Sequence, residues 1–225
     1  MRYGFFDLGQ VRIRVTGTNP GPDGTSYACK ALIDSYKKVP FVDLHAIYQS
    51  VMDSTVFSRL FVAKSKEDNT WSFGKYTFEY DKQRVLMDVG TDDSLVAKRE
   101  TLSVSVPYQD GLSLFYYARD RLYCGKSMDI PTIVKEQKVT THIDFNGERS
   151  GISIDAVDYP VAVVHFEGNA AFVGIFGLTG GFEGWFSDDE ARVPILAKMK
   201  VIIGSVTIEL MGWKRPGWKP PRGKG

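Results

Sequence analysis

The feature that most constrains this chain is an alternation of apolar and polar residues with a period of two. It occupies residues 11–15, 102–106, 195–201 and 206–210. Successive side chains of a β-strand point to opposite faces of a sheet, so the alternation predicts strands with one buried face. Gly204-Ser205 separates the last two runs and predicts a hairpin between them.

Short turns between these runs indicate how the strands are connected. Turn residues cluster at 19–24, 81–83 and 145–148. Links of this length favour antiparallel neighbours over a parallel sheet, which needs long crossovers. The exception is Asp110 to Leu122, where an N-cap residue and helical spacing predict one helix.

We therefore predict an all-β fold with one short helix. The expected architecture is a large curved antiparallel meander of about ten to twelve strands, forming an open or closed barrel-like sheet. A two-sheet sandwich is the structural alternative. No linker is evident before the C-terminal end, so residues 1–213 are predicted to form a single antiparallel β domain, followed by a basic Pro/Gly-rich tail at 214–225.

The charge is balanced overall but unevenly distributed. Lys and Arg total 28 against 27 Asp and Glu, so no nucleic-acid partner is expected on net charge. The last twelve residues, 214–225, nevertheless contain five cations and no acid. Such an end is most often a solvated extension. The alternatives are a course along the body of the protein, docking on an anionic envelope surface, or stacking on a single-stranded nucleic acid through Trp213 and Trp218.

Residues that bind metals or perform catalysis are scattered. The histidines (45, 142, 165) and cysteines (29, 124) match no zinc or haem spacing, so we predict no metal site and no cofactor. The cysteines are expected to be unpaired thiols, with a disulfide as the alternative in an oxidising compartment. No residue is assigned a catalytic role. The run Asp188-Asp189-Glu190 could supply paired carboxylates to a hydrolase, but we favour a role in capping a turn.

Aromatic residues concentrate in two segments, 71–80 and 172–186. We expect the aromatic side chains of the first segment to face the core. The second segment is also rich in glycine, so it could form an apolar flap over a cavity mouth or a hairpin packed under the sheet. The candidate ligand-binding residues are Trp71, Tyr76, Phe78, Tyr80, Phe176, Phe182 and Trp185.

The C-terminal hairpin carries a resemblance to a known family. Residues 185–195, with Trp-Phe-Ser-Asp-Asp followed by Arg-Val-Pro, and 203–210, with Gly-Ser before a last strand, resemble the closing signature of the bacterial domain of unknown function 3108. Other residues that resemble family positions in the same order are Tyr3, Gly9, Tyr48, Ser50, Asp53, Asp110-Gly111-Leu112-Ser113, Tyr116, Tyr117 and Arg119.

The resemblance implies a bacterial, exported cell-envelope protein with a mostly antiparallel β fold and no established activity. Its expected location is the periplasm or the outer-membrane surface, with a precursor leader removed. Our first hypothesis is a non-catalytic protein that binds an apolar small molecule or lipid in a barrel-like cavity. The second is an interaction or assembly module that uses a sheet edge or the basic tail. The third is a hydrolase of an envelope polymer.

Overall fold

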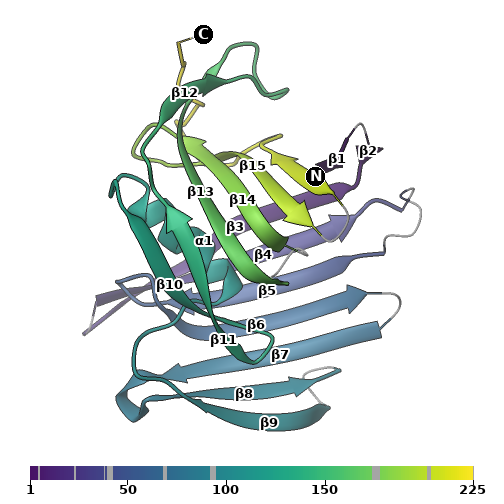
Figure 1. Cartoon of the computed structure of the whole chain (residues 1–225), viewed down its shortest axis with the longest axis vertical. Coiled ribbons are helices and arrows are strands. Elements are labelled where there is room, and N and C mark those ends of the chain that lie inside the picture. The colour runs from purple at the N-terminus through teal and green to yellow at the C-terminus, as the bar shows by residue number, and fades with distance from the viewer. Residues whose placement is uncertain are drawn as a thin grey trace. The chain divides into compact units, whose positions relative to one another are not determined.

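The computed structural model describes residues 1–4, 6–22, 24–37, 39, 43–67, 70–91, 95–173, 178–201 and 204–224. These residues form sixteen strands, one α-helix and one short 3-10 helix (Figure 1). The chain divides into two compact units. Unit 1 comprises Met1–Phe5, Ala118–Ile130 and Val139–Gly225, and unit 2 comprises Phe6–Tyr117 and Pro131–Lys138.

Unit 2 is built on a seven-stranded antiparallel sheet whose strands follow one another in chain order (Figure 1). Its strands are β3 (Gly9–Gly21), β4 (Gly24–Ser35), β5 (His45–Met52), β6 (Ser58–Glu67), β7 (Thr70–Glu79), β8 (Arg84–Gly90) and β9 (Val96–Ser103), with the 3-10 helix η1 (Tyr80–Lys82) between β7 and β8. This order is the meander that the short turns predict.

The two faces of this sheet differ in burial. The inner face is defined by a register row across β4–β8, formed by Cys29, Ser50, Phe61, Tyr76 and Met87. None of these five side chains is more than 5% exposed. The sheet therefore contributes the core of unit 2 from this face.

Helix α1 (Gly111–Arg121) is the helix predicted between Asp110 and Leu122. Asp110 caps it, because its Oδ1 accepts the amide hydrogens of Leu112, at 2.7 Å, and Ser113, at 2.8 Å. Leu112 and Leu122 are buried at 1% and 0% exposure. The boundary between the two units lies inside this helix, between Tyr117 and Ala118.

The second sheet has nine strands in the order β10-β11-β13-β14-β15-β16-β1-β2, with β12 paired to β13. Its strands are β10 (Ser127–Val134), β11 (Gln137–Asp144), β12 (Arg149–Ile152), β13 (Val161–Val173), β14 (Leu178–Ser187), β15 (Pro194–Val201), β16 (Ser205–Glu209), β1 (Arg2–Tyr3) and β2 (Phe6–Asp7). β15 and β16 pair antiparallel, which confirms the predicted hairpin at Gly204-Ser205.

Unit 1 has its own buried cluster, formed by Ile154, Val161, Val163 and Ile195. A separate stack of phenylalanine rings lies on the other face of β13, where Phe166 is 5.3 Å from Phe186 and 6.0 Å from Phe145 between ring centroids.

The prediction of a mostly antiparallel β fold with one helix is confirmed, but the strands lie in two open sheets rather than in one. The expected number of strands was too low. Cys29 is buried in β4, Cys124 is half-buried after α1, and neither is joined in a disulfide within the described residues. In the described residues, no helix has both the length and the apolar character needed to cross a bilayer.

Candidate functional site

The inner face of the β3–β9 sheet combines aromatic rings with very small residues. The Phe61 ring stacks on Tyr48, at 6.0 Å between centroids, and lies 5.6 Å from the Tyr76 ring. The adjacent register row contains Ala63 and Gly74 beside Tyr48. A Cβ at Gly74 would lie 3.5 Å from the Tyr76 ring, so that ring leans over the glycine. The face is thus stepped, with flat rings bordering two small residues, Ala63 and Gly74, in a row that also contains Tyr48 and Val89.

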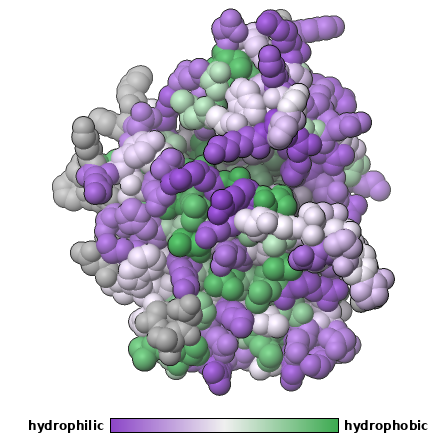
Figure 2. Space-filling model, turned by 180° about the vertical axis from the view of Figure 1, so that it is seen from behind, coloured by the Kyte–Doolittle hydropathy of each residue, from purple (hydrophilic) through white to green (hydrophobic). Residues whose placement is uncertain are grey.

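The outer face of the same sheet also carries apolar side chains, but they are only half-buried. Leu32 pairs with Ile47, and Val51 pairs with Leu60. A neighbouring outer row begins with Arg14 and Lys30. Figure 2, which views the molecule from behind, shows hydrophobic side chains gathered in the middle among hydrophilic ones. This mixture is typical of a sheet face in contact with water, so the inner face is the better candidate.

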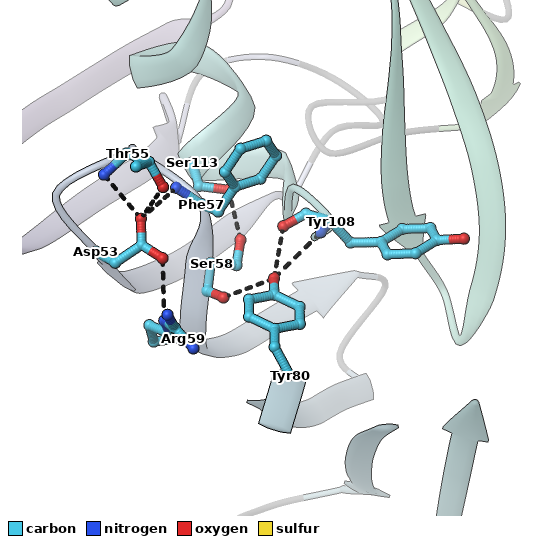
Figure 3. Close-up of polar contacts among 8 residues, drawn as sticks. All are labelled: Asp53, Thr55, Phe57, Ser58, Arg59, Tyr80, Tyr108 and Ser113. Atoms are coloured by element: carbon cyan, nitrogen blue, oxygen red, sulfur yellow. Dashed lines mark hydrogen bonds and ion pairs between the residues drawn. The ribbon is translucent and has the colours of Figure 1, made fainter. Parts of the chain in front are cut away.

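Two tyrosine hydroxyls on or beside the inner face have defined partners. The Tyr76 hydroxyl donates to Glu136 Oε1 at 2.6 Å, and burial, followed by Glu136, raises the pKa of Tyr76. The Tyr80 hydroxyl lies 2.8 Å from the Ser58 carbonyl oxygen and accepts the Tyr108 amide hydrogen at 3.1 Å (Figure 3). Burial also raises the pKa of Tyr80. Both hydroxyls are therefore neutral donors that fix neighbouring segments.

The first turn of α1 is clamped to the sheet by Asp110. Its Oδ2 accepts hydrogen bonds from Ser50 Oγ at 2.7 Å and Ser58 Oγ at 2.8 Å, while Oδ1 caps the helix. The Ser58 and Ser113 hydroxyls lie 2.6 Å apart (Figure 3). Burial raises the pKa of Asp110, and the hydrogen bonds from Ser113, Ser50, Ser58 and Leu112 oppose that shift. We call this arrangement the Asp110 clamp.

The β5–β6 turn is held by a second aspartate. Asp53 Oδ1 accepts the Thr55 amide hydrogen at 2.9 Å and the Phe57 amide hydrogen at 3.1 Å, and Oδ2 accepts Arg59 Nε at 3.0 Å (Figure 3). Ser50 and Asp53 thus serve structural tasks at one end of the sheet. Several residues that carry the family resemblance meet here, because Ser50 binds Asp110.

Gln109, the residue before the clamp, is a buried polar group whose side chain is unsatisfied. It is 0% exposed, and neither its amide nitrogen nor its amide oxygen has a hydrogen-bond partner within the described ranges. Its backbone is fixed, since its N–H donates to the Pro131 carbonyl at 2.9 Å and its carbonyl accepts the Ile133 N–H at 2.8 Å. A buried donor and acceptor left unpaired are costly, and each such group calls for an explanation.

The first group of predicted ligand-binding residues is only partly brought together. Tyr76 and Phe78 are buried at 5% and 4% exposure, and the ring of half-buried Tyr80 lies 5.9 Å from Phe78. Trp71 is 46% exposed and does not face the core, so that expectation was wrong. β7 is paired without interruption, so its side chains alternate between the two faces. Trp71 lies an odd number of positions before Tyr76, and its side chain is therefore on the outer face.

The second group lies in unit 1, where its aromatic rings are used in packing. Phe182 covers Gly168, its direct partner on β13, and Phe166 covers Gly184 in the same way. The Trp185 ring lies 4.9 Å from His165 and packs against the buried cluster of unit 1. Phe176 lies outside the described residues, as does the middle of the proposed flap. The ligand-binding role of these residues stays a prediction.

The acidic run before β15 forms a capped turn. Asp189 Oδ1 accepts hydrogen bonds from Ser187 Oγ at 2.7 Å and from the amides of Ala191 and Arg192 at 3.0 Å each. Its Oδ2 accepts Trp218 Nε1 at 2.7 Å. Asp188 Oδ2 accepts Arg149 Nε at 2.9 Å. These contacts favour the turn-capping interpretation, because Asp188 and Asp189, two of the three carboxylates of the hydrolase hypothesis, are engaged in structural contacts.

Sequence reasoning identified Asp110 as a cap but missed Ser58 and Gln109. Asp110 at the start of a segment with helical spacing is an N-cap signal, whereas nothing in the sequence relates Ser58 to a residue 52 positions away. Gln109 stands in an unremarkable sequence context. Its significance comes from complete burial, which only the fold reveals.

Comparison with known proteins matches residues 1–211 to one family model and the fold to a solved structure. A family model described as "Protein of unknown function (DUF3108)" matches residues 1–211. No curated protein matches the chain. A similar solved structure is the "Beta-barrel-like Protein of Domain of Unknown Function DUF1849 from Brucella abortus", with 12% identity, a TM-score of 0.51, and coverage of 88% of this chain and 93% of that one. This similarity supports the fold alone.

Proposed function

Because the chain belongs to the family described as Protein of unknown function (DUF3108), we propose a function from the site itself. The protein is a non-catalytic protein of the bacterial cell envelope that holds an apolar or lipid ligand in unit 2, against the inner face of the β3–β9 sheet. The envelope location rests on the resemblance of the sequence. Fractionation of cells that express the native gene tests it, and recovery only with cytoplasmic markers would overturn it.

The observation that carries the binding proposal is the unsatisfied amide of Gln109. Its side chain offers one donor group and one acceptor in a fully buried position. A ligand with an acceptor and a donor side by side would satisfy both atoms. A long acyl chain that ends in a primary amide has this combination, because its carbonyl oxygen and one of its N–H groups lie side by side. A pure hydrocarbon would leave the cost of the buried amide in place.

The stepped inner face supports an apolar ligand of this kind. Ligand sites are lined mainly by apolar and aromatic side chains with a few polar groups. Here the side chains of Ala63 and Gly74 are much smaller than those of Phe61 and Tyr76, the neighbouring pair on the same face. An alkyl chain could lie beside these two small residues and contact the bordering rings.

Equilibrium dialysis with radiolabelled palmitamide and hexadecane tests the role of Gln109. Wild type is expected to retain palmitamide more strongly. Gln109→Leu removes both unpaired atoms, so it should weaken palmitamide binding about tenfold while hexadecane binding stays unchanged or improves. The same substitution should leave the melting temperature of the ligand-free protein unchanged or higher. Gln137→Leu, at an exposed position of β11, is the matched control and should change neither affinity.

A second variant tests the surface itself. Gly74→Leu places a bulky side chain next to Ala63 on the inner face. It should reduce the binding of palmitamide and of hexadecane alike, because both use the same alkyl contact. Failure of wild type to bind either probe, or full binding by a folded Gly74→Leu variant, would contradict the proposed site.

A further inference from the structure

The basic tail is fixed along unit 1, which overturns the expectation of a solvated extension. Arg222 forms an antiparallel bridge with Val161, just before β13 pairs with β14 at Val163. The Ala162 amide hydrogen is donated to the Pro221 carbonyl, and the Gly223 amide hydrogen to the Pro160 carbonyl, at 2.8 Å each. The tail therefore continues the sheet edge for a short stretch.

The aromatic residues of the tail face the protein. Trp218 packs against the buried cluster of unit 1 and donates its Nε1 hydrogen to Asp189 Oδ2. Trp213 donates to the Trp218 carbonyl at 3.1 Å, and the two rings meet edge to face at 5.4 Å. Rings engaged in this way are poor platforms for stacked bases. This arrangement argues against a single-stranded nucleic acid as the partner.

The cations of the tail face water instead. We call them the basic strip, and they are Lys214, Arg215, Lys219, Arg222 and Lys224, all exposed. Arg222 is additionally held over the Tyr159 ring at 4.1 Å. Residues 211–224 contain no acid. Among the acidic residues near the tail, Asp189 accepts a hydrogen bond from Trp218, and Asp188 accepts one from Arg149. Asp158, next to Tyr159, is exposed.

The chemistry of this surface fits an extended anionic surface better than a folded protein. Protein interfaces centre on buried aromatic or aliphatic anchors, whereas the strip presents separate cations on a fixed backbone. Met211, 62% exposed, lies immediately before the strip and adds one apolar side chain that can enter a lipid interface. We propose that the basic strip docks unit 1 on a membrane that contains anionic phospholipid.

Vesicle sedimentation tests this docking with the full chain. Each Lys or Arg near an anionic membrane is worth about a fivefold change in affinity. Wild type should bind vesicles of phosphatidylcholine with one third phosphatidylglycerol at least about a hundredfold more tightly than vesicles of phosphatidylcholine alone. High salt should abolish the difference, since exposed charges are screened.

A matched pair of triple variants separates the strip from net charge. Lys214→Gln/Arg215→Gln/Lys219→Gln should weaken binding about a hundredfold without changing the melting temperature. Lys75→Gln/Lys126→Gln/Lys138→Gln removes the same charge from exposed positions elsewhere and should bind like wild type. Equal loss in both variants, no preference of wild type for phosphatidylglycerol, or tighter binding of a single-stranded oligonucleotide would overturn the proposal. None of these outcomes depends on the acyl ligand of unit 2.

Discussion

An aspartate in each unit fixes a turn of the chain, and the two differ in their exposure to water. The carboxylate of Asp110 in unit 2 is fully buried, and that of Asp189 in unit 1 is only half-buried. Each accepts four hydrogen bonds from neutral donors. Because a buried charge has no water to replace a missing partner, the same chemistry should be far less tolerant of change in unit 2.

The contrast is greatest when a carboxylate is removed. Asp110→Ala leaves two hydroxyls and two helix amides without their acceptor, so the free energy of unfolding should fall by about 3–5 kcal/mol. Asp189→Ala should cost about 1–3 kcal/mol, since water reaches its neighbours. Urea unfolding followed by circular dichroism measures both changes. Equal losses would show that burial does not separate the two aspartates.

Glycines beside aromatic rings provide a second contrast between the units. In unit 1, a Cβ at Gly184 would collide with the Phe166 ring, so Gly184→Ala should cost about 1–3 kcal/mol. In unit 2, a Cβ at Gly74 meets the Tyr76 ring at ordinary contact distance. Gly74→Ala should therefore be neutral or stabilise the fold by up to about 1 kcal/mol. Thermal unfolding of the two variants measures the difference, and a Gly74→Ala loss as large as that of Gly184→Ala would contradict it.

Removal of a single hydrogen-bond donor should also lower the free energy of unfolding more at Asp110 than at Asp189, but by a smaller amount than removal of the carboxylate. Ser50→Ala deletes one of the two hydroxyls on Asp110 Oδ2 and should cost about 2 kcal/mol. Trp218→Phe deletes the indole N–H on Asp189 Oδ2 and should cost about 1 kcal/mol. Segment-resolved hydrogen exchange locates each loss, in β5 and β6 for the first and in the turn before β15 for the second. The reverse order would contradict the assignment.

The smallest effect is a pH dependence carried by Asp110. Burial raises its folded-state pKa above the unfolded value of about 3.9. Between these two values the folded state binds more protons, so its stability falls as pH rises. The free energy of unfolding of wild type relative to Asp110→Asn should therefore increase on acidification through this window. A relative decrease would mean that the hydrogen bonds, and not burial, dominate the pKa of Asp110.

Local features were predictable from the sequence, and long-range partners were not. The Asp110 cap and the Gly204-Ser205 hairpin depend on residues a few positions apart, so their signals are visible along the chain. The partnership of Ser58 with Asp110 depends on which strands become neighbours. The odd spacing between Phe73 and Tyr76 is visible in the sequence, and in a regular strand it places Trp71 on the face opposite to Tyr76.

The division of the strands between two sheets and the fixed tail were also beyond the sequence pattern. Alternation shows that a strand has a buried face but not which sheet it joins. Composition suggested that residues 214–225 extend into water, yet Trp218 finds a carboxylate 29 residues away and Pro221 an open strand edge. Long-range contacts of this kind, through side chain and backbone, outweigh the local preference of a Pro/Gly-rich segment.

Native mass spectrometry of the protein purified from its own cell envelope tests the central claim most directly. The account predicts a complex heavier than the chain by the mass of one acyl-chain compound, which unfolding in organic solvent releases and fragmentation identifies as an amide. Gln109→Leu protein prepared in the same way should carry much less of it. A wild-type protein that has only the mass of the bare chain, and that takes up no palmitamide when incubated with it, would contradict the account.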